Sequence, residues 1–146
     1  MSEGTAIWYL DSSVALRVLL GHSEQAAQWF DERAEAGDSF TSSRLLVLEM
    51  MRVYRREGLP VREVAEFVRG LTLLSVDDAL VSEAAAIRPH VKSLDALHLA
   101  SAQRIGAGAA TVVTHSVAVV ARIMEGQGGR VIKTLGDGLM AMFPHP

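Results

Sequence analysis

The chain has 146 residues, of which 49% are hydrophobic and 21% are charged. This length fits one ordinary domain, and the apolar fraction is enough for a sizeable core, so a long disordered tail is not expected. The absence of cysteine excludes disulfides and thiolate metal sites and favours the reducing cytoplasm. With a formal net charge of −3, the chain would need a local basic patch or a metal ion to bind nucleic acid.

The first five residues are polar and do not form a basic region followed by an apolar stretch. We therefore expect no signal peptide. The longest apolar runs are well short of the roughly 18 residues that a membrane helix needs, so no membrane partner is expected.

Short apolar runs that are bounded by polar residues or glycine indicate buried strands. They occupy residues 7–10, 39–41, 71–76, 110–114 and 130–135. Between and after them lie helical segments at about residues 14–20, 24–36, 44–56, 61–69, 78–87, 94–105 and 117–125. This alternation predicts an α/β domain in which helices flank a central parallel sheet.

Polar residues at the helix starts and glycine at one helix end set the expected boundaries. Side-chain caps are expected at Ser23, at Ser42 or Ser43, at Asp77-Asp78 and at Ser93. Gly21 should end the first helix. On the helix 44–56, the spacing favours an inward face made of Leu45, Leu48 and Met51, with Val47 as a further candidate.

Three carboxylates lie at informative positions. Asp11 follows the first strand, and ligands of open α/β sheets bind beyond the carboxyl ends of the strands. Asp95 lies in the first turn of a helix, where the helix dipole favours an anion. Glu49 lies in the middle of a helix between apolar neighbours.

If these three carboxylates converge, their mutual repulsion must be relieved. Two such charges at about 4 Å repel by roughly 4 kcal/mol at an effective dielectric constant of 20. Without a cation, at least one carboxylate would stay protonated. A hard divalent ion such as Mg²⁺ or Mn²⁺ prefers oxygen ligands and removes the conflict.

Each acid also has a purely structural interpretation, and spacing alone does not choose between the two. Asp11 and Asp95 are in places where a carboxylate caps a helix. Glu49 could form a salt bridge with Arg52 or Arg56, which follow it on the same helix.

Three segments together resemble the PIN-domain family, and within it the VapC toxins. They read Tyr-Leu-Asp-Ser-Ser-Val-Ala-Leu at 9–16, Thr-Ser-Ser-Arg-Leu followed by Leu-Glu-Met-Met-Arg ending at 52, and Leu-Asp-Ala-Leu-His-Leu-Ala at 94–100. Val-Val-Thr-His at 112–115 follows at the expected place. The resemblance covers about residues 6–116 and indicates a PIN core at 1–116, with 117–146 packed on the same domain.

The resemblance implies a PIN-like three-layer fold and magnesium-dependent endonuclease cleavage of structured RNA such as tRNA. It carries the metal-binding acids over to Asp11, Glu49 and Asp95. It carries supporting hydroxyl groups over to Ser12, Ser43 and Thr114. It also implies a homodimer and a cognate VapB-type antitoxin.

One position departs from the family pattern. The family usually has an aspartate two residues after this threonine, and this chain has Ser116 there. A serine hydroxyl carries no charge, so we expect weaker metal binding and reduced cleavage.

The segment from about residue 117 onward resembles the helix and β-hairpin of class III adenylate/guanylate cyclases. In that family, Gly-Asp-Gly carries a metal-binding aspartate, and Asp137 would match it. The other parts of a cyclase domain are missing, so the segment is interpreted as a fused or truncated piece. Strand 131–135 should lie at the sheet edge and pair with 139–143 across Gly136-Asp137-Gly138.

Further residues have both a functional and a structural interpretation. Arg52, Arg55 and Arg56 could bind RNA phosphates or form a solvated, ion-paired face. His98 shares a helix face with Asp95 and could orient a site residue, contact RNA or sit at the edge of the core. His115 could touch a phosphate or simply belong to a loop.

Three hypotheses for the function follow. The leading one is a metal-dependent endoribonuclease of the toxin type. The second is a PIN-fold module that binds antitoxin or RNA without efficient cleavage, which the missing acid at Ser116 favours. The third, a cyclase-derived regulatory fragment, would need nucleotide binding that depends on Asp137 or Lys133.

We predict that the substitution Ser116→Asp raises magnesium affinity and RNA cleavage, because it restores a charged oxygen ligand. The measurement is a cleavage rate followed across a magnesium titration. A rate that matches the unsubstituted chain at every magnesium concentration would contradict the prediction.

Overall fold

The computed structural model describes residues 6–87, 92–105, 110–114, 130–135 and 138–142. Its strands are β1 (Ile7–Leu10), β2 (Ser39–Ser43), β3 (Leu71–Leu74), β4 (Ala110–Thr114), β5 (Arg130–Leu135) and β6 (Gly138–Met142). Its helices are α1 (Ser12–Leu20), α2 (Glu24–Glu35), α3 (Arg44–Arg56), α4 (Arg62–Val68), α5 (Asp78–Ala85) and α6 (Ser93–Arg104). Each of these elements was expected from the sequence. The predicted helix 117–125 lies outside the described residues.

All six strands belong to one sheet in the order β3-β2-β1-β4-β6-β5. The first four strands of this order pair in parallel, as predicted. β6 pairs antiparallel with β4, and β5 pairs antiparallel with β6 at the edge. The expected hairpin is therefore present, and it extends the parallel sheet with two antiparallel strands.

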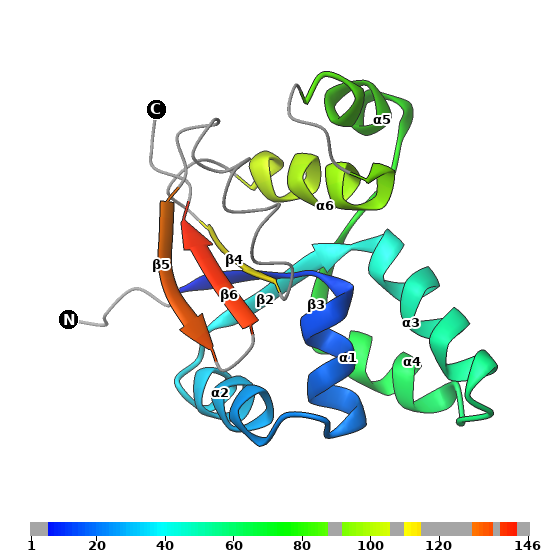
Figure 1. Ribbon diagram of the computed structural model, residues 1–146, viewed down its shortest axis with the longest axis vertical. Helices are drawn as coiled ribbons and strands as arrows, with labels where there is room; N and C mark the ends of the chain where they lie inside the picture. The colour runs from blue at the N-terminus through cyan, green and yellow to red at the C-terminus, as the bar shows by residue number, and fades with distance from the viewer. Residues whose placement is uncertain (1–5, 88–91, 106–109, 115–129, 136–137, 143–146) are drawn as a thin grey trace.

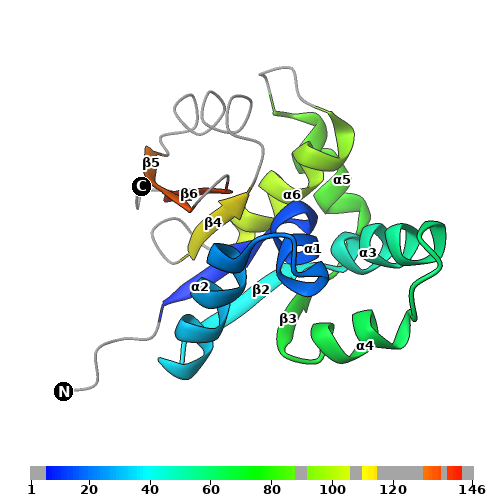
Figure 2. The same cartoon turned by 60° about the horizontal axis from the view of Figure 1, so that its bottom comes forward.

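Helices cover both faces of the sheet and make the three-layer α/β arrangement that the sequence predicted. Figure 1 shows α5 and α6 on one side of the sheet, and α1, α2 and α4 on the other. Figure 2 shows that α3 and α4 lie together beyond the end of the sheet where α1 begins. Among the described residues, no helix is long and apolar enough to cross a membrane.

The main core fills the space between the sheet and helices α1 to α4. Its fully buried side chains include Leu10 from β1, Val14 from α1, and Leu46, Met50 and Tyr54 from α3. A second, smaller cluster joins α5 to α6. The two tryptophans pack edge to face with ring centroids 5.2 Å apart.

The predicted inward face of α3 is wrong. Leu48 is 57% exposed, and the buried residues are Leu46, Met50 and Tyr54. Four apolar residues in succession, 45–48, leave the phase of the helix undetermined from spacing alone. The phase was decided by packing against the sheet, and it turns Glu49 toward α6.

Most of the expected boundaries are confirmed, and one cap is wrong. The side chains of Ser23, Ser43 and Asp77 each accept a hydrogen bond from a backbone N–H in the first turn of their helix. Gly21 ends α1 with φ 71°, in the left-handed region where a side chain would cause strain. Ser93 is already the first residue of α6, and the capping position belongs to Lys92, which makes no side-chain cap.

Burial on α3 gives a stability test with a matched control. Leu46→Ala should lower the free energy of unfolding by about 2–5 kcal/mol, because it leaves a cavity in the main core. Leu48→Ala removes the same atoms from an exposed position and should change it by less than about 0.5 kcal/mol. The two free energies come from urea denaturation, and equal losses would contradict this assignment of the buried face.

Candidate metal and nuclease site

The candidate site lies at the carboxyl ends of the parallel strands. β1 ends at Leu10, so Asp11 is the first residue beyond it and caps α1. Leu10 pairs with Val113 in the register of β1 and β4, which places the backbone of Thr114 beside Asp11. Ser43, at the end of the neighbouring strand β2, is fully buried and caps α3.

Asp11 is fixed by the start of its own helix. Its Oδ1 accepts hydrogen bonds from the Ser13 hydroxyl at 2.6 Å and from the Val14 backbone N–H at 3.2 Å. The capping interpretation is therefore correct. It does not exclude a second role, because a carboxylate has about four lone-pair positions.

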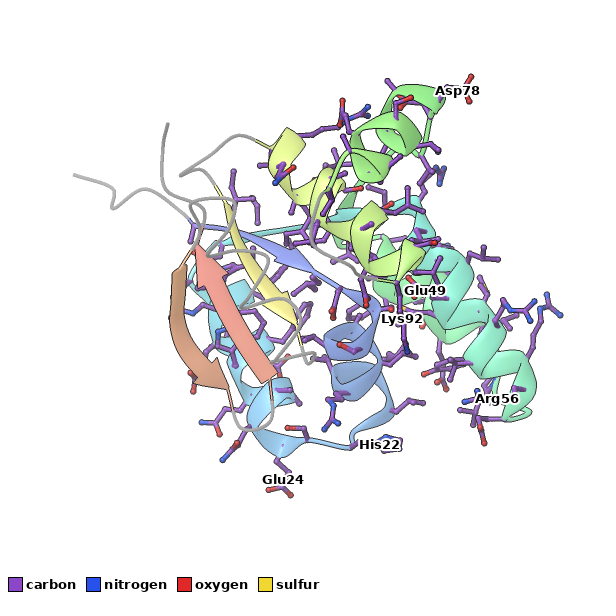
Figure 3. The ribbon with its side chains drawn as sticks, turned by 45° about the horizontal axis from the view of Figure 1, so that its top comes forward. His22, Glu24, Glu49, Arg56, Asp78 and Lys92 are labelled. Atoms are coloured by element: carbon purple, nitrogen blue, oxygen red, sulfur yellow. The ribbon has the colours of Figure 1, made fainter. Side chains whose placement is uncertain are left out.

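Glu49 reaches across to two other elements. Its Oε2 accepts from the Ser12 hydroxyl at 2.9 Å, and its Oε1 lies 2.7 Å from His98 Nε2. Ser12 is next to Asp11 in the chain, and His98 lies one turn after Asp95 on α6. Figure 3 shows Glu49 where α3 faces the start of α6, with Lys92 beside it.

Glu49 is thus held by partners other than the arginines suggested by spacing. Within the part of the chain that the structure describes, its hydrogen bonds go to Ser12 and His98, and Arg56 pairs with Glu57 at 3.0 Å. Arg52, Arg55 and Arg56 are exposed. Arg56 lies at the far end of α3 from Glu49 (Figure 3).

The three acids influence one another electrostatically. Burial raises the pKa of Asp95, and the negative charges of Asp11 and Glu49 raise it further. His98 and Lys92 act in the opposite direction and lower this pKa. The acids that the sequence predicted to converge are therefore close enough for each charge to be felt at Asp95.

These residues fit a hard divalent cation by the chemistry of their donors. They offer carboxylate and hydroxyl oxygens, and their mutual repulsion is the conflict that such an ion relieves. As they stand, no three Asp, Glu or His side chains within residues 6–87 and 92–105 are arranged so that they could hold an ion. Each Glu49 oxygen accepts one hydrogen bond, from Ser12 or from His98, and keeps a second lone pair for an ion.

Other predicted site residues fall in different places. The side chain of Thr114 and the residues Ser116, His115 and Asp137 lie outside what the structure describes. His98 is only 6% exposed, and protein atoms contact both ring nitrogens. That environment matches the orienting role left open by the sequence better than an RNA contact.

Sequence reasoning missed two residues at this site. Tyr9, fully buried on β1, has its hydroxyl 2.7 Å from His98 Nδ1. The sequence pattern marks Tyr9 only as part of an apolar strand and as the first residue of the motif at 9–16, and its hydroxyl group in a buried run is the available signal of a further role. Lys92 was overlooked because a lone exposed lysine beside a helix start has no distinctive pattern.

Comparison with known proteins places the chain among characterised sequences. It matches the PIN domain family over residues 8–114. It is 30% identical over 112 residues to Ribonuclease VapC47 of Mycobacterium tuberculosis. The aligned residues cover 73% of this chain and 82% of that protein. Ribonuclease VapC35 of the same organism is 35% identical over 104 residues, which cover 67% of this chain and 74% of that protein.

Two solved structures have a similar fold at low sequence identity. A toxin-antitoxin complex from Klebsiella pneumoniae contains a chain with a TM-score of 0.63 and 18% identity, covering 78% of this chain and 90% of that one. VapBC2 from Rickettsia felis, bound to a DNA fragment from its promoter, has a chain with a TM-score of 0.53 and 12% sequence identity. The match covers 66% of this chain and 79% of that one. The match over most of its length and the similarity to two VapC ribonucleases establish that this chain belongs to the PIN-domain family.

Proposed function

We propose that this chain is a VapC-type ribonuclease, the toxin of a toxin-antitoxin pair, and that it cuts structured RNA such as tRNA with the help of Mg²⁺ or Mn²⁺. The observation that supports this most directly is that Glu49 bonds to Ser12, next to Asp11, and to His98, one turn after Asp95. The similarity to two VapC ribonucleases supports the choice of RNA as substrate.

Asp11, Glu49 and Asp95 would hold the ion, with the hydroxyl groups of Ser12, Ser43, Thr114 and Ser116 around them. When bound, the ion would polarise a phosphoryl oxygen and lower the pKa of a coordinated water. Ser12 and His98 hold the Glu49 carboxylate, and Ser13 and the Val14 backbone hold Asp11. The ammonium group of Lys92, exposed beside Asp95, would attract an RNA phosphate.

The partners are proposed on the same basis. A cognate VapB-type antitoxin is suggested by similarity to chains taken from toxin-antitoxin complexes. Phosphate contacts through Arg52, Arg55 and Arg56 are part of the proposal, since these arginines are exposed. A homodimer is proposed from the resemblance to the VapC toxins alone.

The alternative is a PIN-fold module that binds antitoxin or RNA without efficient cleavage. The specific observation in its favour is Ser116, which replaces a charged ligand with a neutral hydroxyl group. A purified protein that binds its antitoxin but leaves RNA intact at saturating Mn²⁺ would favour this alternative.

Cleavage of labelled tRNA by the purified protein with Mn²⁺ tests the proposed activity. Asp95→Asn should lower the cleavage rate by at least about a hundredfold. With one carboxylate ligand lost, the ion is bound more weakly, and several kcal/mol of transition-state stabilisation are lost with it. Asp78→Asn is the matched control, since Asp78 is an exposed aspartate in the first turn of α5, remote from Glu49 (Figure 3). Equal rates for both variants would contradict the assignment of Asp95.

The raised pKa of Asp95 gives a separate prediction about stability. The folded chain binds the Asp95 proton more tightly than the unfolded chain, so stability is lost as pH rises from about 4, the unfolded pKa, through the folded value. Asp95→Asn removes this loss. In metal-free protein it should raise the melting temperature at pH 7, with a smaller gain at pH 4.

Added Mn²⁺ should make the unsubstituted chain more stable than Asp95→Asn. At a Mn²⁺ concentration about 100 times its dissociation constant, the unsubstituted chain should gain about 2.7 kcal/mol, and Asp95→Asn should gain far less. Thermal unfolding with and without EDTA measures both effects. A metal-free Asp95→Asn protein that melts below the unsubstituted chain at pH 7 would contradict the electrostatic account.

A further inference from the structure

A buried tyrosine and a buried histidine stand behind Glu49. The Tyr9 hydroxyl lies 2.7 Å from His98 Nδ1, and His98 Nε2 lies 2.7 Å from Glu49 Oε1. Tyr9 is fully buried and His98 is 6% exposed, so little water competes for these bonds. The two rings meet edge to face, with centroids 5.9 Å apart and planes at 72°. The chain of contacts joins β1 to α6 and then to α3.

The direction of each hydrogen bond follows from the groups involved. A carboxylate can only accept, so the nitrogen that faces Glu49 must carry a hydrogen. In the neutral imidazole, the other nitrogen, Nδ1, is then an acceptor, and Tyr9 must donate to it. Burial raises the pKa of Tyr9, which keeps the phenol protonated as a donor.

The Glu49 carboxylate needs such support because a long, flexible side chain separates it from the backbone of α3. It projects from the middle of a helix through a long side chain with several rotatable bonds. Ser12 donates to one of its oxygens and His98 to the other, so the carboxylate is fixed at both ends. Each oxygen has a second lone pair, so these bonds leave acceptor positions for a cation.

We propose that Tyr9 and His98 form a positioning pair that orients the Glu49 carboxylate for a divalent cation. Glu49 selects the His98 tautomer that carries its hydrogen on Nε2, and Tyr9 holds the ring in place by donating to Nδ1. This inference rests on the metal site of the proposed function. Neither residue touches the substrate, and both act through Glu49. A ligand fixed before the ion arrives binds it more tightly, and the loss of such outer partners typically costs about 10–100-fold in metal affinity.

The opposing interpretation is that the pair only satisfies polar groups in the core. Two amide substitutions separate these views, because each copies one ring nitrogen. The amide of His98→Gln reaches the place of Nε2 and can still donate to Glu49. The amide of His98→Asn reaches only the place of Nδ1, so it leaves Glu49 without this donor.

The experiment measures the Mn²⁺ dissociation constant of the full chain by titration calorimetry or electron paramagnetic resonance, without RNA. His98→Asn should weaken Mn²⁺ binding about tenfold, and His98→Gln should stay within about threefold of the unsubstituted chain. Tyr9→Phe should fall between them. His22→Asn is the control, since His22 is exposed after α1 and should leave the constant unchanged.

A second measurement does not depend on how the variants fold. Long-range ¹H–¹⁵N spectra of the unsubstituted chain should show His98 as the Nε2–H tautomer. An Nδ1–H tautomer in the unsubstituted chain would overturn the inference. So would equal Mn²⁺ affinity in the two amide variants.

A separate measurement of tRNA cleavage tests the proposed activity. If the chain binds Mn²⁺ with the expected order of variants but cuts no RNA, the positioning pair stands and the nuclease proposal fails. If it cuts RNA and His98→Asn binds Mn²⁺ as the unsubstituted chain does, the pair is rejected and the nuclease proposal stands. A chain that binds no Mn²⁺ overturns both the pair and the metal site.

Discussion

Three carboxylates near one edge of the sheet, those of Asp11, Glu49 and Asp95, influence one another electrostatically. Burial raises the pKa of Asp95, and the charges of Asp11 and Glu49 raise it further. A fold selected for stability alone would not bring such groups together, because partly buried like charges destabilise it. Their proximity is understandable if a divalent cation completes the site, and the family to which the chain belongs makes a nuclease the natural proposal.

The topology explains how residues so distant in sequence meet. Four parallel strands end at the same edge, so Asp11 and Thr114 become neighbours through the register of β1 and β4. The helices α1 and α3 begin directly beyond β1 and β2, and both begin with capped first turns. The same edge therefore collects polar groups for a structural reason, and the site uses residues that also cap helices.

The surroundings of Glu49 connect the core to this edge. Tyr9 and His98 are buried polar residues that would be costly without partners, and each is bonded to the other. Because His98 also contacts Glu49, a core interaction is transmitted to a residue of the site.

Local sequence pattern was sufficient to predict the described strands and helices and the hairpin, because periodicity and caps act over a few neighbouring positions. It also named Asp11, Glu49 and Asp95 as candidate site residues. Tertiary structure alone decided the phase of α3, where 45–48 are all apolar and packing left Leu48 exposed and turned Glu49 toward α6. It also decided the partners of Glu49. Spacing pointed to arginines on the same helix, whereas the observed partner His98 is 49 residues away in the chain. Hydrogen bonds between remote elements leave no periodic trace in a sequence, so Tyr9 and His98 could be joined to Glu49 only once the sheet had brought them together.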